Sequence, residues 1–500
     1  MVDLSFLYQR LPSVAKPEQK LTLRDKAMWT GIMLVLYFLL GSVLVWGVNP
    51  SAVSRFEFLE IVFGSRFGSL ITLGIGPIVT ASIILQLLVG SKIIDWDLKT
   101  AEGKEKFTGS QKLLGIAFSF IEGIAYVLAG AVPPISPQLG IFVMLQLALG
   151  GIIIIFMDEV VSKWGIGSGI SLFIAAGVSK TIMLRIFSPT IGDIPGGVIS
   201  AFISSLSQGQ PSAAFLSLLP LVATIVVFFI VVFAQSMKIE IPMAITMPFG
   251  KFAARRWPLK FIYTSNIPVI LVAAVIANIQ VLGRLLFQRG ITFLGDYDPA
   301  GRPLNGIAYL LSPTSSIGLT VATVLAGVFA LIFAYIGIKI FKKHVLKLAL
   351  LGGIVGLVWG YILINAYSLP ALTQADIVGS LVYMSVFIIG SVIFSIFWVS
   401  TSGMDASSVA EQFKAASIVV PGFRHDPRII EKLLNKYIPA VTVLGGAFVG
   451  FLASFADLTS AIGTGTGILL TVMIMYQLYE QLVSQHYDDL PPQVKKFLGI

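Results

Sequence analysis

A single carboxylate, Glu122, is the most conspicuous candidate for chemistry because it lies near the middle of a long apolar run. Polar groups within such runs are costly in lipid and tend to be functional. In a transporter Glu122 would be a proton or cation site, whereas in a scaffold it would form one buried interhelical hydrogen bond. The residues alone favour neither alternative. Other polar side chains also lie within apolar runs: Thr80, Gln86, Gln146 and Asn278.

Side chains suited to metal binding or nucleophilic catalysis are scarce. The three histidines, His344, His425 and His486, lie in connections or in the tail and are far apart in sequence, and the chain has no cysteine. A metal site or a Ser-His-Asp triad cannot be assembled from this pattern. We therefore predict that the protein is not an enzyme and that it uses no metal or other cofactor.

Glycine-rich runs resemble fragments of nucleotide-binding loops at three places, Leu73–Pro77, Trp164–Gly169 and Gly463–Gly467. None has the Gly-Lys-Ser/Thr ending of a phosphate-binding loop, and none follows a strand. Each lies at the start of an apolar run, where small residues allow close helix approach or a break in the helix. We interpret them as packing positions.

The elements that carry these residues are predicted to lie in lipid. Of the 500 residues, 56% are hydrophobic and 12% are charged, whereas about a quarter of the residues in soluble domains are charged. A helix needs about 20 apolar residues to cross the hydrocarbon core, and long continuous runs favour helices over barrel strands. Twelve candidate spans cover residues 28–48, 71–90, 111–131, 138–157, 168–187, 214–236, 261–286, 317–341, 348–367, 377–399, 437–456 and 461–482.

Basic residues predict the orientation of these spans. The net charge is +9, and in the twelve-span arrangement nearly all basic clusters fall on the side of the N-terminus. Cytoplasmic connections are enriched in Lys and Arg, so both termini are predicted to be cytoplasmic. Two basic connections, 237–260 and 400–436, are unusually long. Their length favours a docking surface for an anionic partner over a role in orientation alone.

Segment 51–70 differs from the spans because it is too short and too charged to cross a membrane. In the predicted topology it lies on the outer side. A short amphipathic helix is expected there, either on the bilayer surface or within a funnel of the protein.

Long stretches of the sequence resemble the channel subunit of the Sec translocon, the SecY and Sec61 alpha family. Residues Ile71–Leu88 resemble the signature of its second helix, and Asp158–Ile174 resemble a second signature. The last span from Gly463 to Glu480 is also similar, as are Ser265–Ile270 and Pro421–Arg424. The likeness extends from about residue 20 to residue 485 and is nearest to the archaeal and eukaryotic branch.

This resemblance implies an all-α polytopic membrane protein, a ten-helix clamshell of two pseudo-symmetric halves, residues 1–187 and 188–500. It implies a channel that translocates unfolded polypeptides and inserts hydrophobic segments into the membrane through a lateral gate. Branched apolar side chains would close the pore at mid-membrane and exclude ions and water by dewetting. By motif position, these are Ile75, Val79, Ile170, Ile174, Ile270 and Leu470.

The same resemblance assigns roles to other features. Thr80, Glu122 and Asn278 match a polar cluster at the lateral gate, and residues 55–66 match a plug that seals the resting pore. The long basic connections resemble ribosome-docking loops, in which phosphate contacts with ribosomal RNA would be salt-dependent. The residues expected to dock are Lys251, Arg255, Arg256 and Arg424.

The partners implied by the resemblance are two small membrane subunits, similar to SecE or Sec61 gamma and to Sec61 beta. A ribosome would supply the driving force, nascent polypeptides bearing signal sequences would be the substrates, and the cell membrane would be the location. A secondary transporter, with Glu122 and Asn278 at a small-solute or proton site, is the alternative.

One feature departs from the family pattern of ten spans. The additional pair of spans, residues 317–367, falls between the family's seventh and eighth helices. Such a hairpin could pack on the gate, replace contacts of an accessory subunit, or be peripheral, and the sequence leaves all three open.

Overall fold

The structure is a computed structural model. In its first half, helices are separated by short connections. It describes residues 11–19, 21–49, 60, 64–98, 100–189, 196–246, 252–264, 266–298, 303–313, 316–338, 345–366, 373–415, 418–419 and 427–486. The helices up to residue 187 are α2 (Leu23–Leu40), α4 (Gly76–Gly90), α5 (Ala101–Leu128), the 3-10 turn η1 (Pro137–Leu139), α6 (Gly140–Trp164) and α7 (Gly169–Phe187).

The second half contains more helices and a small sheet. Its helices are α8 (Val198–Ser207), α9 (Pro211–Ser236), α10 (Ile267–Gln288), α11 (Gly306–Leu310), α12 (Ile317–Ile336), α13 (Val345–Ala366), α14 (Gln374–Thr401), α15 (Ala406–Ala415), α16 (Pro427–Leu458) and α17 (Gly465–His486). The strands are β1 (Lys238–Thr246), β2 (Phe252–Lys260) and β3 (Ile418–Val419). The protein is therefore mostly helical, as predicted.

Each of the twelve predicted spans overlaps a helix, but their number stays a prediction. Among the described residues, nine helical stretches are long and apolar enough to cross a membrane. Helices α2, α4 and α17 are not among them, and α4 has only 15 residues. Helix α4 begins at Gly76, later than expected, because Gly74 adopts a positive φ of 52° and Pro77 favours the first turn of a helix.

The first helix also differs from its predicted limits of 28–48. Thr22 forms a capping box with Asp25, so α2 starts at Leu23. The Thr22 hydroxyl accepts from the Asp25 amide at 3.2 Å, and the Asp25 carboxylate accepts from the Thr22 amide at 3.3 Å. The helix ends at Gly41, and the residues that follow form turns.

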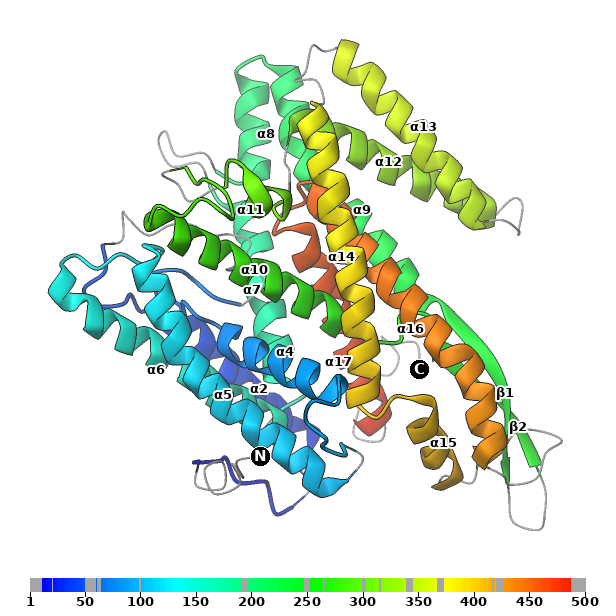
Figure 1. Ribbon diagram of the computed structural model, residues 1–500. Helices are drawn as coiled ribbons and strands as arrows, with labels where there is room; N and C mark the ends of the chain where they lie inside the picture. The colour runs from blue at the N-terminus through cyan, green and yellow to red at the C-terminus, as the bar shows by residue number, and fades with distance from the viewer. Residues whose placement is uncertain are drawn as a thin grey trace.

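A single large apolar core joins helices from both halves. It contains buried side chains of α2, α4, α6, α7, α9, α10, α14, α16 and α17. Helix α4 packs against α10 and α14, and α5 also packs against α10, while α7 packs against α17. Figure 1 shows α10 and α14 beside α4 near the centre of the molecule. Among the described residues, the two halves thus meet both at α4 and α5 and at α7.

The two long basic connections meet in one three-stranded sheet, an arrangement that the sequence did not predict. Strand β1 pairs antiparallel with β2, and it also pairs with β3, so that Ala244 lies opposite Val419. A second apolar cluster, separate from the main core, packs this sheet against α15 and α16. In Figure 1 the strands, α15 and the N-terminal segment lie toward the lower end, and α8 and α11 toward the upper end.

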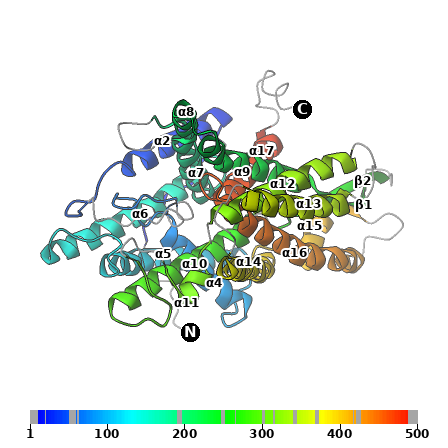
Figure 2. The same cartoon turned by 90° about the horizontal axis from the view of Figure 1, so that it is seen from above.

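The additional hairpin, α12 and α13, packs away from the polar cluster expected at the gate. Helix α12 contacts α9 and α16, and the Thr320 hydroxyl lies 2.8 Å from that of Ser460. Helix α13 packs mainly on α12 through Gly352, Gly356 and Gly360, spaced four residues apart, which allow close approach. Figure 2 shows the hairpin beside α9 and α16, apart from α4 and α5. Among the described residues, the main contacts of the hairpin are with α9 and α16, which favours a place away from the expected gate.

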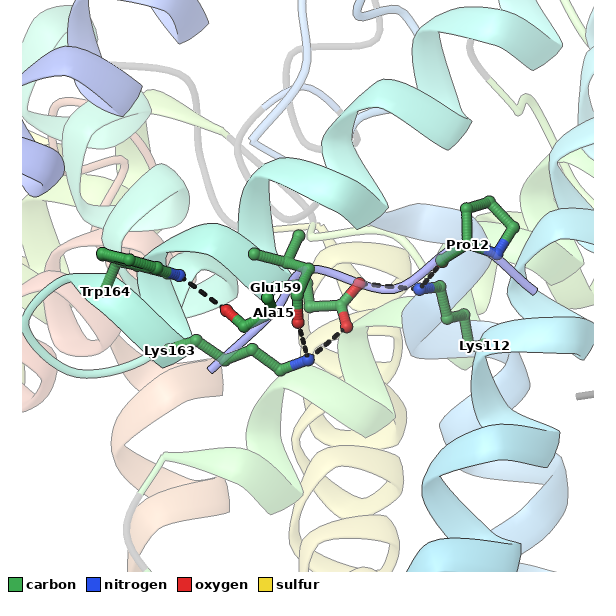
Figure 3. A network of polar contacts seen from close by, with 7 residues as sticks. Pro12, Ala15, Lys112, Glu159, Lys163 and Trp164 are labelled. Atoms are coloured by element: carbon green, nitrogen blue, oxygen red, sulfur yellow. Dashed lines mark hydrogen bonds and ion pairs between the residues drawn. The ribbon is translucent and has the colours of Figure 1, made fainter. Parts of the chain in front are cut away.

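The N-terminal segment is tied to α5 and α6 by an ion-pair network (Figure 3). Glu159 accepts from Lys112 at 2.6 Å and from Lys163 at 2.7 Å. Both lysines also donate to the backbone of residues 12–15, and so does the indole of Trp164. These contacts hold the segment across the ends of the two helices.

Candidate functional site

Three polar side chains from three helices form a hydrogen-bonded cluster inside the helical bundle. The Thr80 hydroxyl on α4 donates to Oε1 of Glu122 on α5 at 2.8 Å. The amide of Asn278 on α10 donates to the Thr80 hydroxyl oxygen at 3.1 Å. The structure thus brings together all three residues predicted to form a polar cluster. The bond between Asn278 and Thr80 joins the two halves of the chain.

Glu122 is the most deeply buried member of this cluster. Its side chain is 7% exposed, and its second oxygen, Oε2, has no hydrogen-bond partner among the described residues. A buried acceptor without a partner is costly. The free oxygen therefore reduces the net stabilisation that the cluster gives to the contact between the two halves.

A second set of polar contacts lies at the far end of the same interface. The Gln288 amide on α10 donates to the carbonyl of Ala129 at 2.7 Å, and the Arg284 guanidinium donates to the carbonyl of Gly130 at 3.4 Å. Ala129 and Gly130 follow the last turn of α5, where carbonyls lack intrahelical partners. A cation is favourable at that helix end. We call these four residues the end clasp.

Sequence reasoning missed the end clasp. The signal was present, because Arg284 is a charged residue within an apolar run, and such residues usually have a partner or a function. Its partner in the end clasp is a backbone carbonyl, however, and the sequence pattern does not identify backbone partners. Tyr297 lies nearby and donates to the carbonyl of Gln280 at 3.1 Å. Burial raises the pKa of Tyr297 to about 12, although the Arg284 guanidinium opposes this, so the phenol stays a donor at physiological pH.

The six apolar residues predicted to form a ring all belong to the main core. They lie in the first two turns of four helices or at their N-terminal boundary. Ile170 is partly buried, and the other five are 5% exposed or less. The ring candidates by helix are Ile75 and Val79 for α4, Ile170 and Ile174 for α7, Ile270 for α10 and Leu470 for α17. The starts of four helices therefore all contribute to the same apolar core.

The predicted plug is described only at its end. Residues 55–59 and 61–63 lie outside the described residues, whereas Glu60 and residues 64–66 are within them. The Tyr37 hydroxyl donates to the carbonyl of Gly64 at 2.8 Å. A Cβ on Gly64 would lie 3.3 Å from the backbone of Phe173, beside Ile174. This end of the segment is thus seated against the start of α7.

The structure describes two of the four residues predicted to dock a ribosome. Lys251 and Arg424 lie outside the described residues. Arg255 and Arg256 lie in β2, where their backbones pair with Met243 and Pro242 of β1. The base of this hairpin is fixed, because the Trp257 ring packs edge-on against Phe413 of α15 with ring centroids 4.9 Å apart. The hairpin of β1 and β2 is therefore anchored to α15 at its base.

The described residues were also searched for side chains that could bind a metal ion. Among the residues that the structure covers, no group of three or more His, Cys, Asp or Glu side chains could hold a metal ion. The candidate site thus consists of apolar residues near the starts of four helices and of an interface between the two halves that contains a small number of hydrogen bonds.

Comparison with known proteins finds one family. The SecY family model matches residues 69–479. The chain is 41% identical over 499 residues to the protein translocase subunit SecY of Methanocaldococcus jannaschii, covering all of both chains. It is 41% identical to that of Methanothermobacter thermautotrophicus, covering 99% of this chain and 98% of the relative.

Solved structures agree in fold. One described as a protein conducting channel is 40% identical to this chain and superposes with a TM-score of 0.78. The match covers 98% of each chain. Another, Sec61 in a canine ribosome-channel complex from the endoplasmic reticulum, is 40% identical with a TM-score of 0.75 and the same coverage. A yeast Ssh1 complex bound to the 80S ribosome, 21% identical with a TM-score of 0.71, shares the fold.

Proposed function

The chain belongs to the SecY family, and from this premise we propose that it is the protein-conducting channel of a Sec translocon. It moves unfolded polypeptides across the membrane and releases hydrophobic segments sideways into lipid. The observation that carries this conclusion is the full-length similarity, in sequence and in fold, to SecY subunits and to a protein-conducting channel. Nothing in the site favours the transporter alternative.

The lateral gate is the interface at which α4 and α5 meet α10 and α14. The polar cluster of Thr80, Glu122 and Asn278 holds this interface shut at its middle. A hydrophobic signal segment entering between the helices would replace these few hydrogen bonds by apolar contact with lipid and protein. Because the contacts are few, the stabilisation needed for opening is small enough for a single signal segment to supply.

The resting seal is formed by the apolar ring and the plug. Ile75, Val79, Ile170, Ile174, Ile270 and Leu470 present aliphatic side chains that deform around a moving chain and exclude ions when none is present. The support for this assignment is that all six lie near helix starts and pack in or against the main apolar core. The contact of Gly64 with the start of α7 supports a plug that ends against the ring helices.

The clamshell consists of the halves 1–187 and 188–500. Helices α4 and α5 of the first half meet α10 and α14 of the second at the gate. Helices α7 and α17 pack together on another face, which would act as the hinge. The additional hairpin packs on α9 and α16 of the second half.

The driving force comes from a partner, and the channel itself is passive. The sheet that joins the two basic connections is the proposed docking surface for a ribosome, with Arg255 and Arg256 contacting RNA phosphates. Structures of related channels in ribosome complexes support this role. The two small subunits are expected as further partners. The protein is a multi-pass membrane protein, proposed to lie in the cell membrane with both termini cytoplasmic.

Reconstitution tests the function directly. Proteoliposomes containing the chain with the expected small subunits should protect a reporter polypeptide from protease only when it carries a functional signal sequence. Failure of signal-dependent protection, in vesicles that retain folded protein, would contradict the channel assignment. The variant Glu122→Gln separates the alternatives, because a proton-coupled transporter would lose coupling whereas this channel should still translocate.

A further inference from the structure

Two aspartates near the ends of α6 and α16 accept hydrogen bonds from the start of the next helix. Asp158 Oδ1 accepts from the amide of Ile170 at 2.8 Å, and Asp457 Oδ1 accepts from the amide of Thr466 at 2.8 Å. Asp457 is 7% exposed, and Asp158 is partly buried.

In α7 these contacts take the place of an ordinary helix cap, whereas in α17 they add to one, because the Thr464 hydroxyl accepts from the amide of Gly467 at 3.1 Å. The first amides of a helix lack intrahelical partners, and a negative charge is favourable at that end. In α7 the residue before the helix, Ser168, caps no amide with its side chain, so the cap comes from Asp158, ten residues earlier. A carboxylate on one helix therefore fixes where the next helix begins.

Glycine makes this approach possible in both halves. A Cβ on Gly169 would lie 2.6 Å from Cα of Asp158, and one on Gly465 would lie 1.9 Å from the carbonyl carbon of Ala456. Real side chains do not approach so closely. The glycine-rich runs at Trp164–Gly169 and Gly463–Gly467 are thus explained as the clearance for a capping carboxylate.

The capped helices are the last helix of each half, and both carry ring residues in their first two turns. Asp158 holds the amide of Ile170, itself a ring residue one turn before Ile174. Asp457 holds Thr466, one turn before Leu470. We propose that Asp158 and Asp457 are positioning residues that set the diameter of the apolar constriction. This inference depends on the proposed channel function, because it assigns a role within that constriction.

Asp457 also contacts α14, one of the helices of the proposed gate. Its Oδ2 accepts from the hydroxyl of Tyr383 on α14 at 2.8 Å, and the Thr466 hydroxyl also donates to it. Helix α14 packs on α4, where a Cβ on Gly90 would lie 2.5 Å from the ring of Phe397. A displacement of α14 during gate opening therefore pulls on the carboxylate that positions Leu470. Gate and constriction are coupled through this side chain.

The test compares removal of each carboxylate with its conservative replacement. Asp158→Ala and Asp457→Ala leave buried amides unpaired, whereas Asp158→Asn and Asp457→Asn keep an acceptor oxygen. Resting ion conductance in planar bilayers should rise about tenfold in the alanine variants, the factor that corresponds to about 1.4 kcal/mol. In the asparagine variants the resting conductance should stay close to that of the unchanged chain. Asp95→Ala, in an exposed connection, is the matched control.

A labelling measurement gives a readout that general destabilisation would not reproduce. The chain has no cysteine, so Ile174→Cys provides a unique thiol. A membrane-impermeant thiol reagent should modify it faster when Asp158→Ala is added, and at the original rate when Asp158→Asn is added. Equal rates in all three backgrounds would overturn the inference.

Controls separate this inference from the function on which it depends. If Ile174→Gly raises the conductance and the alanine variants do not, the positioning role is wrong and the ring stands. If Ile174→Gly has no effect either, the ring assignment itself is wrong. Should the alanine variants not accumulate, Tyr383→Phe removes one donor from Asp457 and leaves its helix cap intact. We expect Tyr383→Phe to raise conductance severalfold, and an unchanged value would contradict the coupling.

Discussion

Asn278 on α10 donates a hydrogen bond to the hydroxyl of Thr80 on α4 at 3.1 Å, although the two residues are 198 positions apart. Thr80 in turn donates to Glu122, so its hydroxyl is the centre of the cluster that joins the two halves. The isosteric change Thr80→Val therefore removes two hydrogen bonds at once. The contact between the two halves should lose more from this change than from a substitution at either end of the cluster.

We expect Thr80→Val to open the gate more readily than Asn278→Ala. With Thr80 absent, both Asn278 and Glu122 keep buried polar groups without partners, at a cost of about 1–3 kcal/mol. Transport of a reporter with a weakened signal sequence should rise in both variants, and more in Thr80→Val. Thr108→Val, which removes an exposed hydroxyl in α5, is the control. Equal transport in Thr80→Val and the control would refute the gate assignment.

The end clasp gives a second prediction at the same interface. Gln288→Leu removes the donor to the carbonyl of Ala129, and one lost hydrogen bond is worth about 1 kcal/mol. Resting conductance and weak-signal transport should both rise by about fivefold. Gly130→Ala should act in the same direction, because Gly130 has a φ of 60° and its Cβ would lie 2.6 Å from the Gln288 amide nitrogen. A clasp without a role in gating would leave both measurements unchanged.

The helices and the polar cluster could be predicted from the sequence for a physical reason. In lipid, a long apolar run must satisfy its own backbone hydrogen bonds, so it has few structures other than a helix. The rarity of polar groups in such runs draws attention to Thr80, Glu122 and Asn278, but that the three meet is predicted only by the resemblance to the family. Their hydrogen bonds were found, whereas their role in gating stays a prediction.

The remaining features depend on contacts that leave little mark on the sequence. Pairing of β1 with β3 joins Ala244 to Val419 across a long stretch of chain, and strand pairing of this kind has no local signal. The end clasp and the capping aspartates use backbone groups as partners, which every residue carries. The start of α2 was misplaced because apolarity, rather than the Thr22 capping box, was used to set its limits.

The docking surface makes a prediction that depends on salt. Arg255→Glu and Arg256→Glu should weaken ribosome binding at low salt and make its salt dependence less steep, because each lost phosphate contact lowers that slope by about one unit. Co-sedimentation over a range of salt concentrations measures both effects. Lys347→Glu, an exposed basic residue on α13, is the matched charge reversal and should have little effect. Binding unchanged by all three variants would show that the ribosome docks elsewhere.

The N-terminal segment should be released by a single change. Glu159→Gln weakens both ion pairs with Lys112 and Lys163, which are only partly exposed, and charged hydrogen bonds of this kind contribute about 1–3 kcal/mol. Limited proteolysis should cleave the segment several times faster. Glu102→Gln is the control, since its ion pair with Lys106 is on the surface and such pairs contribute little. Equal cleavage in the two variants would mean that the network does not hold the segment.

The additional hairpin should be dispensable for gating but should support the second half. Helix α12 packs on α9 and α16 and its Thr320 bonds to Ser460, whereas the polar cluster lies on α4, α5 and α10. Replacing residues 317–366 by a short flexible linker should therefore leave signal-dependent transport and resting conductance close to those of the intact chain. The same change should lower the unfolding temperature in detergent, because it uncovers the apolar faces of α9 and α16. Gly356→Leu, which forces α13 away from α12, should lower that temperature without affecting transport. A rise in resting conductance after the deletion would instead show that the hairpin helps to keep the gate closed.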